Sequence, residues 1–230
     1  MRILGFDTAL SACSAALWED GRILARSHET MPRGQSERLM PMVLEVMDEA
    51  GIRFPDVDLL AVTTGPGAFT GLRIGLAAAR GMALAGGLPC LGVTTLDAVA
   101  AGVPEPERQA GQLLVTLESR RADLYAQAFD HDLKPRGDPR AVLPGDLPAM
   151  VDGDGPVIVA GDAAGPAAES LYAAGVEVAL SAAPGVPDGA VVAAVAAGRW
   201  SPDAIPAPPA PLYLRPPDAT VPRKGGRLRP

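Results

Sequence analysis

Aromatic residues are scarce in this chain of 230 residues. They make up 4% of the sequence, whereas hydrophobic residues as a group make up 48%. A core with so few rings must be filled by Ala, Val, Leu and Met side chains, and it depends on the close approach of helices. This hydrophobic content is enough for a sizeable core. The length corresponds to one large or two small domains, and we expect two.

Cysteine and histidine are also rare, with two residues of each. Cys13 and Cys90 lie in apolar segments without the spacing of a zinc site, so we expect buried thiols and neither zinc nor a disulfide framework. His28 and His131 lie in different halves of the chain. Because a catalytic metal needs at least three ligands, the sequence predicts no metal site and disfavours a metallopeptidase.

Positive charge is in deficit, with a formal net charge of −7. This disfavours a protein whose whole surface binds nucleic acid, because phosphate binding depends on clustered Lys and Arg. The exception is the C-terminal end, where Arg223, Lys224, Arg227 and Arg229 alternate with Gly and Pro. We expect a disordered basic tail at 219–230, and a solvated chain end without a function is its simplest interpretation.

Long apolar runs are missing too. No stretch of 18 uncharged apolar residues is present, and the first residues lack the charge and apolar pattern of a signal peptide. We therefore expect a cytoplasmic protein without a membrane partner.

What the sequence does contain is a glycine-rich segment, TGPGAFTGLRIG, at residues 64–75. It follows an apolar run that predicts a buried strand, and it precedes a helix predicted over 71–85 with Thr70 as its N-cap. Free amides in such a turn can bind a phosphate, although neither GxxxxGK[ST] nor GxGxxG is present. The other interpretation is a tight turn that is needed only for packing.

Asp7 and Thr8 end the first predicted strand, where they could meet a bound phosphate or a magnesium ion. A turn carboxylate that accepts hydrogen bonds from backbone amides is the alternative for Asp7. The candidate nucleotide-binding residues are Asp7, Thr8, Gly65, Gly67 and Thr70.

Two predicted helices are apolar on more than one face. Residues 35–50 carry two adjacent apolar rows, and the helix over 71–85 is interrupted only by Arg73 and Arg80. Such helices are covered on both sides, either within the fold or by a partner protein. The residues that we assign to a partner interface are Leu39, Met40, Val43, Leu44, Met47, Leu72, Gly75, Leu76, Ala79 and Met82.

The predicted elements occur in the same order twice, a strand hairpin followed by alternating strands and helices, which indicates a structural duplication. A proline-rich spacer at 202–211 precedes residues 212–215, which we expect to dock onto the body of the protein. The expected units are an N-terminal α/β domain at 1–103 with the partner-binding helices, a smaller C-terminal α/β domain at 104–218, and the tail.

Four segments resemble the TsaB family, also called YeaZ. They are Asp7-Thr8, QSERLMP at 35–41, the glycine segment at 65–75 and PLYLR at 211–215. The glycine segment is highly specific, and the resemblance is strong over residues 1–100. It implies an actin-like, sugar-kinase-like (ASKHA) ATPase fold of two related α/β domains with mixed sheets.

The resemblance also implies a function. TsaB proteins are non-catalytic subunits that pair with TsaD, the enzyme that threonylcarbamoylates the adenosine beside the anticodon in tRNAs reading codons that begin with A. Pairing uses the first two helices of the N-terminal domain, and TsaB alone forms homodimers through a similar surface. TsaE and tRNA are then partners only within the complex. No cofactor is firmly implied for this subunit, and ATP or ADP with magnesium is a candidate ligand of the complex.

Two departures from the family pattern leave other functions open. Gln35 stands where the family often has His, and Glu118-Ser119-Arg120 stands where it commonly has Asp-Ala-Arg. The main alternative is a kinase-like, ATP-dependent phosphotransferase of the same fold, although no catalytic base stands out beside Asp7. Direct tRNA binding, which the net acidity disfavours, would use the basic tail and exposed arginines. The candidates for that role are Arg33, Arg38, Arg73 and Arg80.

Overall fold

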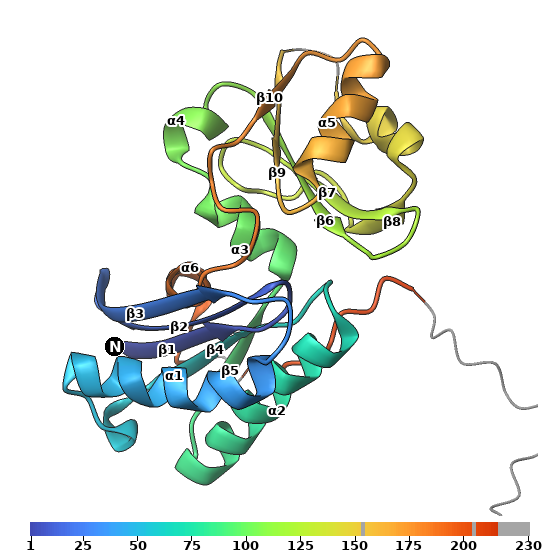
Figure 1. The fold of residues 1–230 in the computed structure, drawn as a ribbon. Helices are drawn as coiled ribbons and strands as arrows, with labels where there is room; N and C mark the ends of the chain where they lie inside the picture. Colours follow the sequence, from blue (N-terminus) through green and yellow to red (C-terminus); the bar gives the residue numbers. More distant parts are fainter. Residues whose placement is uncertain (153–154, 204–205, 216–230) are drawn as a thin grey trace, which may run out of the picture.

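The computed structural model describes residues 1–152, 155–203 and 206–215. The predicted basic tail at 219–230 lies outside these residues. Within the described ranges, no helix is both long and apolar enough to cross a membrane. The chain forms two β-sheets, one below the other in Figure 1, with helices on their faces.

The first sheet has the strand order β3-β2-β1-β4-β5. β1, β2 and β3 are antiparallel, whereas β4 runs parallel to β1 and β5 runs parallel to β4. Asp20 and Gly21 form the turn between β2 and β3, and they have the positive φ angles of 46° and 90° that a tight two-residue turn requires. The strands are β1 Arg2–Asp7, β2 Ala12–Glu19, β3 Arg22–Thr30, β4 Leu59–Thr63 and β5 Cys90–Val93.

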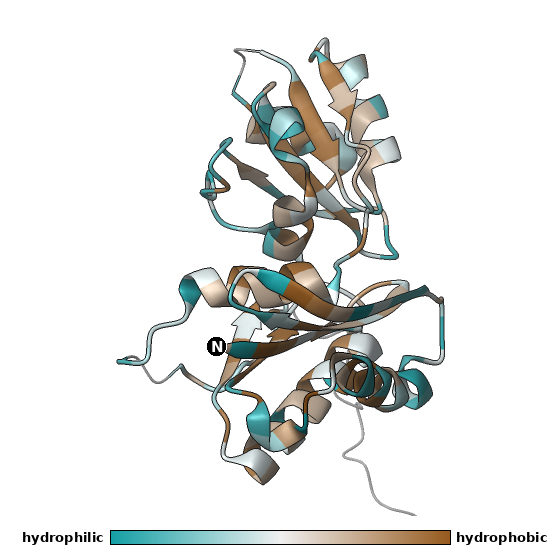
Figure 2. Ribbon diagram, turned by 90° about the vertical axis from the view of Figure 1, so that its left-hand side faces the viewer, coloured by the Kyte–Doolittle hydropathy of each residue, from teal (hydrophilic) through white to brown (hydrophobic). Residues whose placement is uncertain are grey.

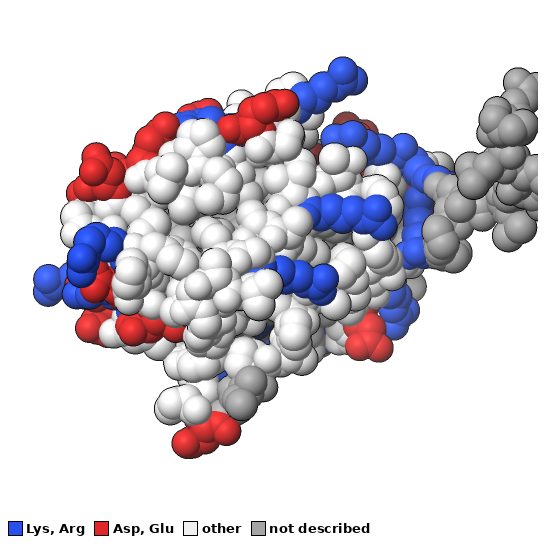
Figure 3. Space-filling model, turned by 90° about the horizontal axis from the view of Figure 1, so that it is seen from below, with Lys and Arg blue, Asp and Glu red and all other residues white. Residues whose placement is uncertain are grey.

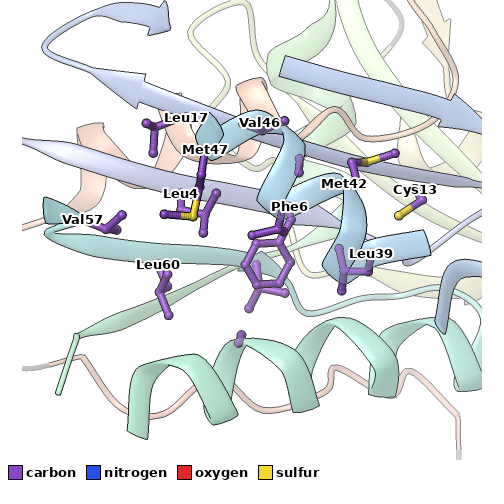
Figure 4. Packing of buried hydrophobic residues seen from close by; sticks show 14 of the residues in the cluster. Leu4, Phe6, Cys13, Leu17, Leu39, Met42, Val46, Met47, Val57 and Leu60 are labelled. Atoms are coloured by element: carbon purple, nitrogen blue, oxygen red, sulfur yellow. The ribbon is translucent and has the colours of Figure 1, made fainter. Parts of the chain in front are cut away.

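Three helices cover this sheet. α1 (Gln35–Ala50) and α2 (Phe69–Gly86) lie side by side on one face, and α6 (Gly189–Arg199) lies on the other (Figure 1). The predicted bounds of α1 are confirmed, and Gly51 ends the helix with φ 65°, a conformation that glycine adopts without a Cβ clash. Figure 4 shows Leu39 and Met42 of α1 beside Phe6 of β1 in the core.

The second sheet repeats the first. Its order, β8-β7-β6-β9-β10, and its strand directions correspond to β3-β2-β1-β4-β5, so the predicted duplication is confirmed in the sheet topology. α5 (Ala164–Ala173) and a 3₁₀ segment, η2 (Pro144–Met150), pack together on one face. The strands are β6 Gln112–Glu118, β7 Leu124–Phe129, β8 Arg140–Val142, β9 Val157–Ala160 and β10 Val178–Leu180.

Short elements escaped prediction from the sequence. These are η1 (Phe54–Asp56), α4 (Glu105–Arg108), β8 and η2. Each is too short, or too interrupted by proline, to show a hydrophobic period. The longer elements were predicted from their apolar residues. Figure 2 shows these residues concentrated on the strands, with hydrophilic ones at the edges and loops.

The two halves exchange one helix each. α3 (Thr95–Gly102) follows the last strand of the first sheet, yet Leu96 and Val99 pack against β6 of the second sheet. α6 follows the second sheet, yet Val192 and Ala196 pack against β1 and β4 of the first. The structure therefore differs from the expected unit at 104–218, because each sheet needs an apolar cover on its second face and receives it from the other half.

We call the first sheet with α1, α2 and α6 the first lobe, and the second sheet with α3 and α5 the second lobe. The exchanged helices α3 and α6 lie in contact with each other at the junction between the lobes (Figure 1).

Candidate functional site

The glycine segment is joined to the end of β1 by backbone contacts. The amide of Ala68 donates to the carbonyl of Ala9 at 2.8 Å, and Thr8 Oγ1 donates to the carbonyl of Gly71 at 2.7 Å. A Cβ atom on Gly67 would lie 2.5 Å from the carbonyl oxygen of Ala9, and one on Gly71 would lie 2.1 Å from that of Thr8. Close packing is therefore a sufficient reason for glycine at both positions.

The other predicted residues of this segment have separate roles. Gly65 has φ 111°, and a Cβ there would lie 2.9 Å from the carbonyl oxygen of Leu212. Thr70 is exposed and does not cap α2, because the helix begins at Phe69 and includes Thr70 in its first turn. The predicted N-cap was therefore wrong, and Ala68 occupies that position without a side-chain cap.

Asp7 is sealed inside the first lobe, with no solvent exposure. Its Oδ1 atom accepts hydrogen bonds from Thr63 Oγ1 at 2.5 Å and from the amide of Ala9 at 3.0 Å. Its Oδ2 atom is buried and has no hydrogen-bond partner in the described part of the chain. Burial raises the pKa of Asp7 to about 7, against the opposing effect of the Thr63 hydrogen bond, while the charge of Asp188 raises it further.

This raised pKa leads to a prediction for Asp7→Asn. Because the folded-state pKa lies above the usual aspartate value of 3.8, Asp7 favours the folded state at low pH and loses that contribution as the pH rises through about 7. The asparagine variant lacks this loss of stability. We therefore expect the free energy of unfolding of the variant, minus that of the wild type, to be about 2 kcal/mol larger at pH 8 than at pH 5.

Urea unfolding of both proteins at the two pH values measures this difference. Asp48→Asn, which changes an exposed carboxylate on α1, is the control for the general loss of an acidic group. If the curves of stability against pH for Asp7→Asn and the wild type were parallel, the buried carboxyl would not titrate in this range.

A cavity of about 750 Å³ lies between the lobes. It is lined by the residues after β1, the start of α2, the turn between β6 and β7, and Asp162 after β9. Of the predicted nucleotide-binding residues, Gly67 and Thr70 line this cavity, whereas Asp7, Thr8 and Gly65 do not. The turn at 118–120 departs from the family pattern in sequence, and its place in this cavity was not predicted.

Residues 206–215, which we call the C-terminal strap, run from the first lobe to the second. The amide of Leu212 donates to the carbonyl of Thr64 at 2.7 Å, which confirms the predicted docking. Tyr213 lies beside α2, where its hydroxyl accepts a hydrogen bond from Arg73 Nε at 3.2 Å. Arg215 forms an ion pair with Asp123 of the second lobe. The strap therefore forms a wall of the cavity and connects its two sides.

The candidate partner-binding residues divide by burial. Met40 is 41% exposed and Leu44 is 63% exposed, and Met82 is half-buried. The helical spacing of residues 35–50 could not show which of the two apolar rows faces the sheet, because both rows are apolar. The remaining candidates are buried against the sheet and each other, so the structure corrects their assignment to a surface. They are Leu39, Val43, Met47, Leu72, Gly75, Leu76 and Ala79.

The structure adds Leu84 to this surface, since it is 87% exposed on α2. We give the name helical face to six of the exposed, uncharged residues on these two helices. Figure 3 views this side from below and shows a largely uncharged area, with basic side chains crossing part of it and acidic ones on several sides around it. The helical face consists of Met40, Pro41, Leu44, Ala77, Gly81 and Leu84.

Three of the arginines considered for tRNA binding already have partners within the chain. Arg38 forms ion pairs with Glu29 and Glu45, each at 2.6 Å. Arg80 donates to the carbonyl of Pro209 in the C-terminal strap at 2.6 and 3.1 Å, and Arg73 contacts Tyr213. These contacts give the arginines structural roles, while Arg33 is exposed.

The cysteines are free and buried, as predicted. Burial raises the pKa of each thiol to about 11. Over the described ranges, no group of three or more His, Cys, Asp and Glu side chains is placed to hold a metal ion.

Comparison with known proteins identifies relatives. The family model described as "TsaD: tRNA N6-adenosine threonylcarbamoyltransferase" matches residues 28–145, about half of the chain. The tRNA threonylcarbamoyladenosine biosynthesis protein TsaB of Escherichia coli is 40% identical over 132 residues, which are 57% of this chain and 56% of that protein. The chain thus aligns with little more than half the length of this relative.

Two further relatives span nearly the whole chain. An uncharacterized protein of Mycobacterium tuberculosis is 33% identical over 221 residues, covering 94% of this chain and 93% of that protein. A crystal structure from Pseudomonas aeruginosa, of a protein described as similar to peptidase YeaZ, has a TM-score of 0.81 and 27% identity, and it covers 93% and 99% of the two chains. The predicted fold, two related α/β lobes of the actin-like, sugar-kinase-like (ASKHA) type, is confirmed.

Proposed function

Because the chain belongs to the TsaB (YeaZ) family, we propose that it is a non-catalytic subunit of the machinery that threonylcarbamoylates tRNA. In this proposal it pairs with TsaD, which modifies the adenosine beside the anticodon of tRNAs reading codons that begin with A. TsaE and tRNA bind only the assembled complex, in the cytoplasm. The chain forms a homodimer through the same surface when TsaD is absent.

The helical face is the observation that carries this proposal. Leu44 and Leu84 expose 63% and 87% of their surface on two adjacent helices of the first lobe. Large apolar side chains that are gathered on one face, with polar residues around them, are typical of a protein interface. Basic side chains cross part of this face and acidic ones surround it, so charges on a partner can add to the specificity of the contact (Figure 3).

The likeness to the TsaD family model supports the identity of the partner. The match covers α1 and α2, the two helices of the helical face. A paralogue of the same fold has the same two helices. The two helix pairs can therefore pack against each other about an approximate two-fold axis. The same geometry allows two copies of this chain to pair through that surface, so homodimer and heterodimer would compete for it.

The burial of Asp7 supports a non-catalytic role. The carboxyl group at the end of β1 accepts hydrogen bonds from Thr63 and Ala9 inside the lobe and has no exposed oxygen. A phosphotransferase needs a carboxylate that reaches magnesium or the attacking hydroxyl group. A subunit without such a group can still raise the rate of its partner by binding the active conformation of that partner more tightly than the inactive one.

Light scattering tests the proposal. The full chain, TsaD from the same organism and their mixture are measured for molecular mass at equal concentrations. We expect self-association of the chain alone and a one-to-one heterodimer in the mixture. A chain that stays separate from TsaD at micromolar concentration would contradict the proposal, and turnover of ATP with an alcohol by the chain alone would favour the phosphotransferase.

A further inference from the structure

We propose that the C-terminal strap is a clasp that fixes the angle between the two lobes and opens at its second-lobe end, where Arg215 meets the turn between β6 and β7. Opening of the clasp lets the lobes move apart and changes access to the cavity between them. The proposal concerns the conformation of the single chain and goes beyond the pairing through the helical face. None of the six residues of that face belongs to the strap.

The lobes are joined by a pivot that lies apart from the strap. The chain crosses between the lobes after β5 and again after β10, and the exchanged helices α3 and α6 are in contact there. Leu10 and Leu72 of the first lobe share an apolar cluster with Leu96 of α3. In Figure 1 the two helices lie to the left, and the strap lies to the right in orange-red. Two bodies joined on one side can rotate about that side, so a contact on the other side is needed to fix their angle.

The strap is attached to the first lobe over several residues. Arg80 of α2 donates to the carbonyl of Pro209 at 2.6 and 3.1 Å, and the amide of Leu212 donates to a carbonyl of the glycine segment at 2.7 Å. The Tyr213 ring is stacked on that of Phe69, with ring centroids 5.8 Å apart. Contacts of these kinds do not depend on a pair of opposite charges, so salt weakens them little. This end of the strap therefore stays in place.

On the second lobe the strap is held by Arg215. Its guanidinium forms an ion pair with Asp123, and its Nη2 atom donates to Ser119 Oγ at 3.4 Å. It also lies 5.7 Å from the centre of the Tyr125 ring. The side chains of the ion pair are 22% and 19% exposed, so loss of one partner leaves a partly buried charge uncompensated. Because opposite charges hold this end, salt weakens it, and it is the end that opens.

Ser119 connects the clasp to one of the departures from the family pattern. The turn reads Glu118-Ser119-Arg120 where the family commonly has Asp-Ala-Arg. Ser119 Oγ lies 2.5 Å from the backbone oxygen of Asp123 and 2.8 Å from its Oδ1 atom, so one hydroxyl group fixes the carboxylate that receives Arg215. The methyl group of an alanine makes no such hydrogen bond. The clasp is therefore strengthened by a residue in which this chain departs from its family.

Single-molecule energy transfer between two dyes on the full chain measures the lobe angle. The dyes are attached to cysteines introduced at exposed positions, Asp48→Cys on α1 and Glu169→Cys on α5. Cys13 and Cys90 are buried, and burial raises the pKa of each thiol to about 11, which keeps them unreactive. Single chains are observed, so self-association does not contribute. We expect a closed population that gives way to an open one as NaCl is raised from about 0.01 M to about 1 M.

Two variants and a matched control test the clasp. Arg215→Gln should raise the ratio of open to closed molecules by about tenfold or more at low salt, and it should remove most of the salt dependence. Ser119→Ala should raise the ratio by about threefold. Arg136→Gln breaks an ion pair with Asp152 inside the second lobe and should leave the ratio unchanged within about twofold. Thermal unfolding checks that each variant is folded.

The proposal is overturned if Arg215→Gln and the unaltered chain have the same distance distribution at low and high salt. It is equally overturned if the salt dependence persists in Arg215→Gln, because another contact would then hold the lobes. These outcomes are separate from the pairing with TsaD, which light scattering measures. Salt-dependent opening in a chain that does not pair would reject the interface alone, and pairing without any opening would reject the clasp alone.

Discussion

Replacing Leu44 and Leu84 together with aspartate is expected to weaken the proposed pairing with TsaD by at least about 100-fold. Both side chains are more than half exposed in the single chain, so the change costs little in folding. In the pair they would be buried, and a buried carboxylate without a partner costs several kcal/mol. Since each tenfold change in affinity corresponds to about 1.4 kcal/mol, even a partial cost gives the stated effect.

Leu143 and Leu180 provide the matched control. They are 54% and 60% exposed, but they lie on the second lobe, away from α1 and α2. Leu143→Asp with Leu180→Asp makes the same chemical change and should leave the dissociation constant unaltered. Light scattering and titration calorimetry measure pairing, and thermal unfolding checks each variant. Equal pairing of the two double variants would remove the helical face from the interface.

Gly71→Ala is expected to destabilise the fold by more than about 3 kcal/mol. The added Cβ would lie 2.1 Å from the carbonyl oxygen of Thr8, which belongs to the backbone and cannot rotate away. The glycine segment would have to separate from the end of β1, with loss of the hydrogen bond from Thr8 Oγ1 to the Gly71 carbonyl. Overpacking combined with a broken buried hydrogen bond is among the most costly effects of a single substitution.

Gly81 lies on the same helix and gives the opposite expectation. A Cβ there meets nothing within 4 Å, and the residue is exposed. Gly81→Ala should therefore stabilise the chain by about 0.5–1 kcal/mol, because alanine has the higher helix propensity. Urea unfolding of both variants gives the comparison. Similar stabilities would mean that the segment adapts to the methyl group and that the glycine is not required for packing.

The sequence was sufficient to predict the regular elements of the first lobe. The apolar runs on either side of Asp20-Gly21 indicate β2 and β3, and the two adjacent apolar rows of residues 35–50 indicate α1, because these signals are local. The glycine segment was correctly placed between a strand and a helix. An anion site and a packing turn can be distinguished only once it is known that Thr8 and Ala9 contact this segment. The sequence alone does not show which segments of the chain come into contact.

The candidate cavity was harder to predict for the same reason. Phe69 and Tyr213 are 144 positions apart, and Arg120 lies on the other lobe. Each residue alone resembles an ordinary surface side chain. Their association depends on the C-terminal strap, whose position follows from side-chain contacts and from one backbone hydrogen bond at Thr64. The side chains that hold the strap are Arg73, Arg80 and Asp123. Hydrogen bonds and ion pairs between distant segments leave no periodic pattern of hydrophobic residues in the sequence.

The exchange of α3 and α6 between the lobes determines when the chain can finish folding during synthesis. β1 leaves the ribosome well before the helix that covers its second face, because Gly189–Arg199 follows it by about 180 residues in the sequence. Until then Ile3, Leu59 and Ala61 keep their α6 side uncovered. The nascent chain therefore exposes an apolar sheet from the completion of β5 at Val93 until α6 has been made, and at about 5–20 residues per second this interval lasts roughly 5–20 seconds. Chaperones that bind exposed apolar strands have that interval in which to act.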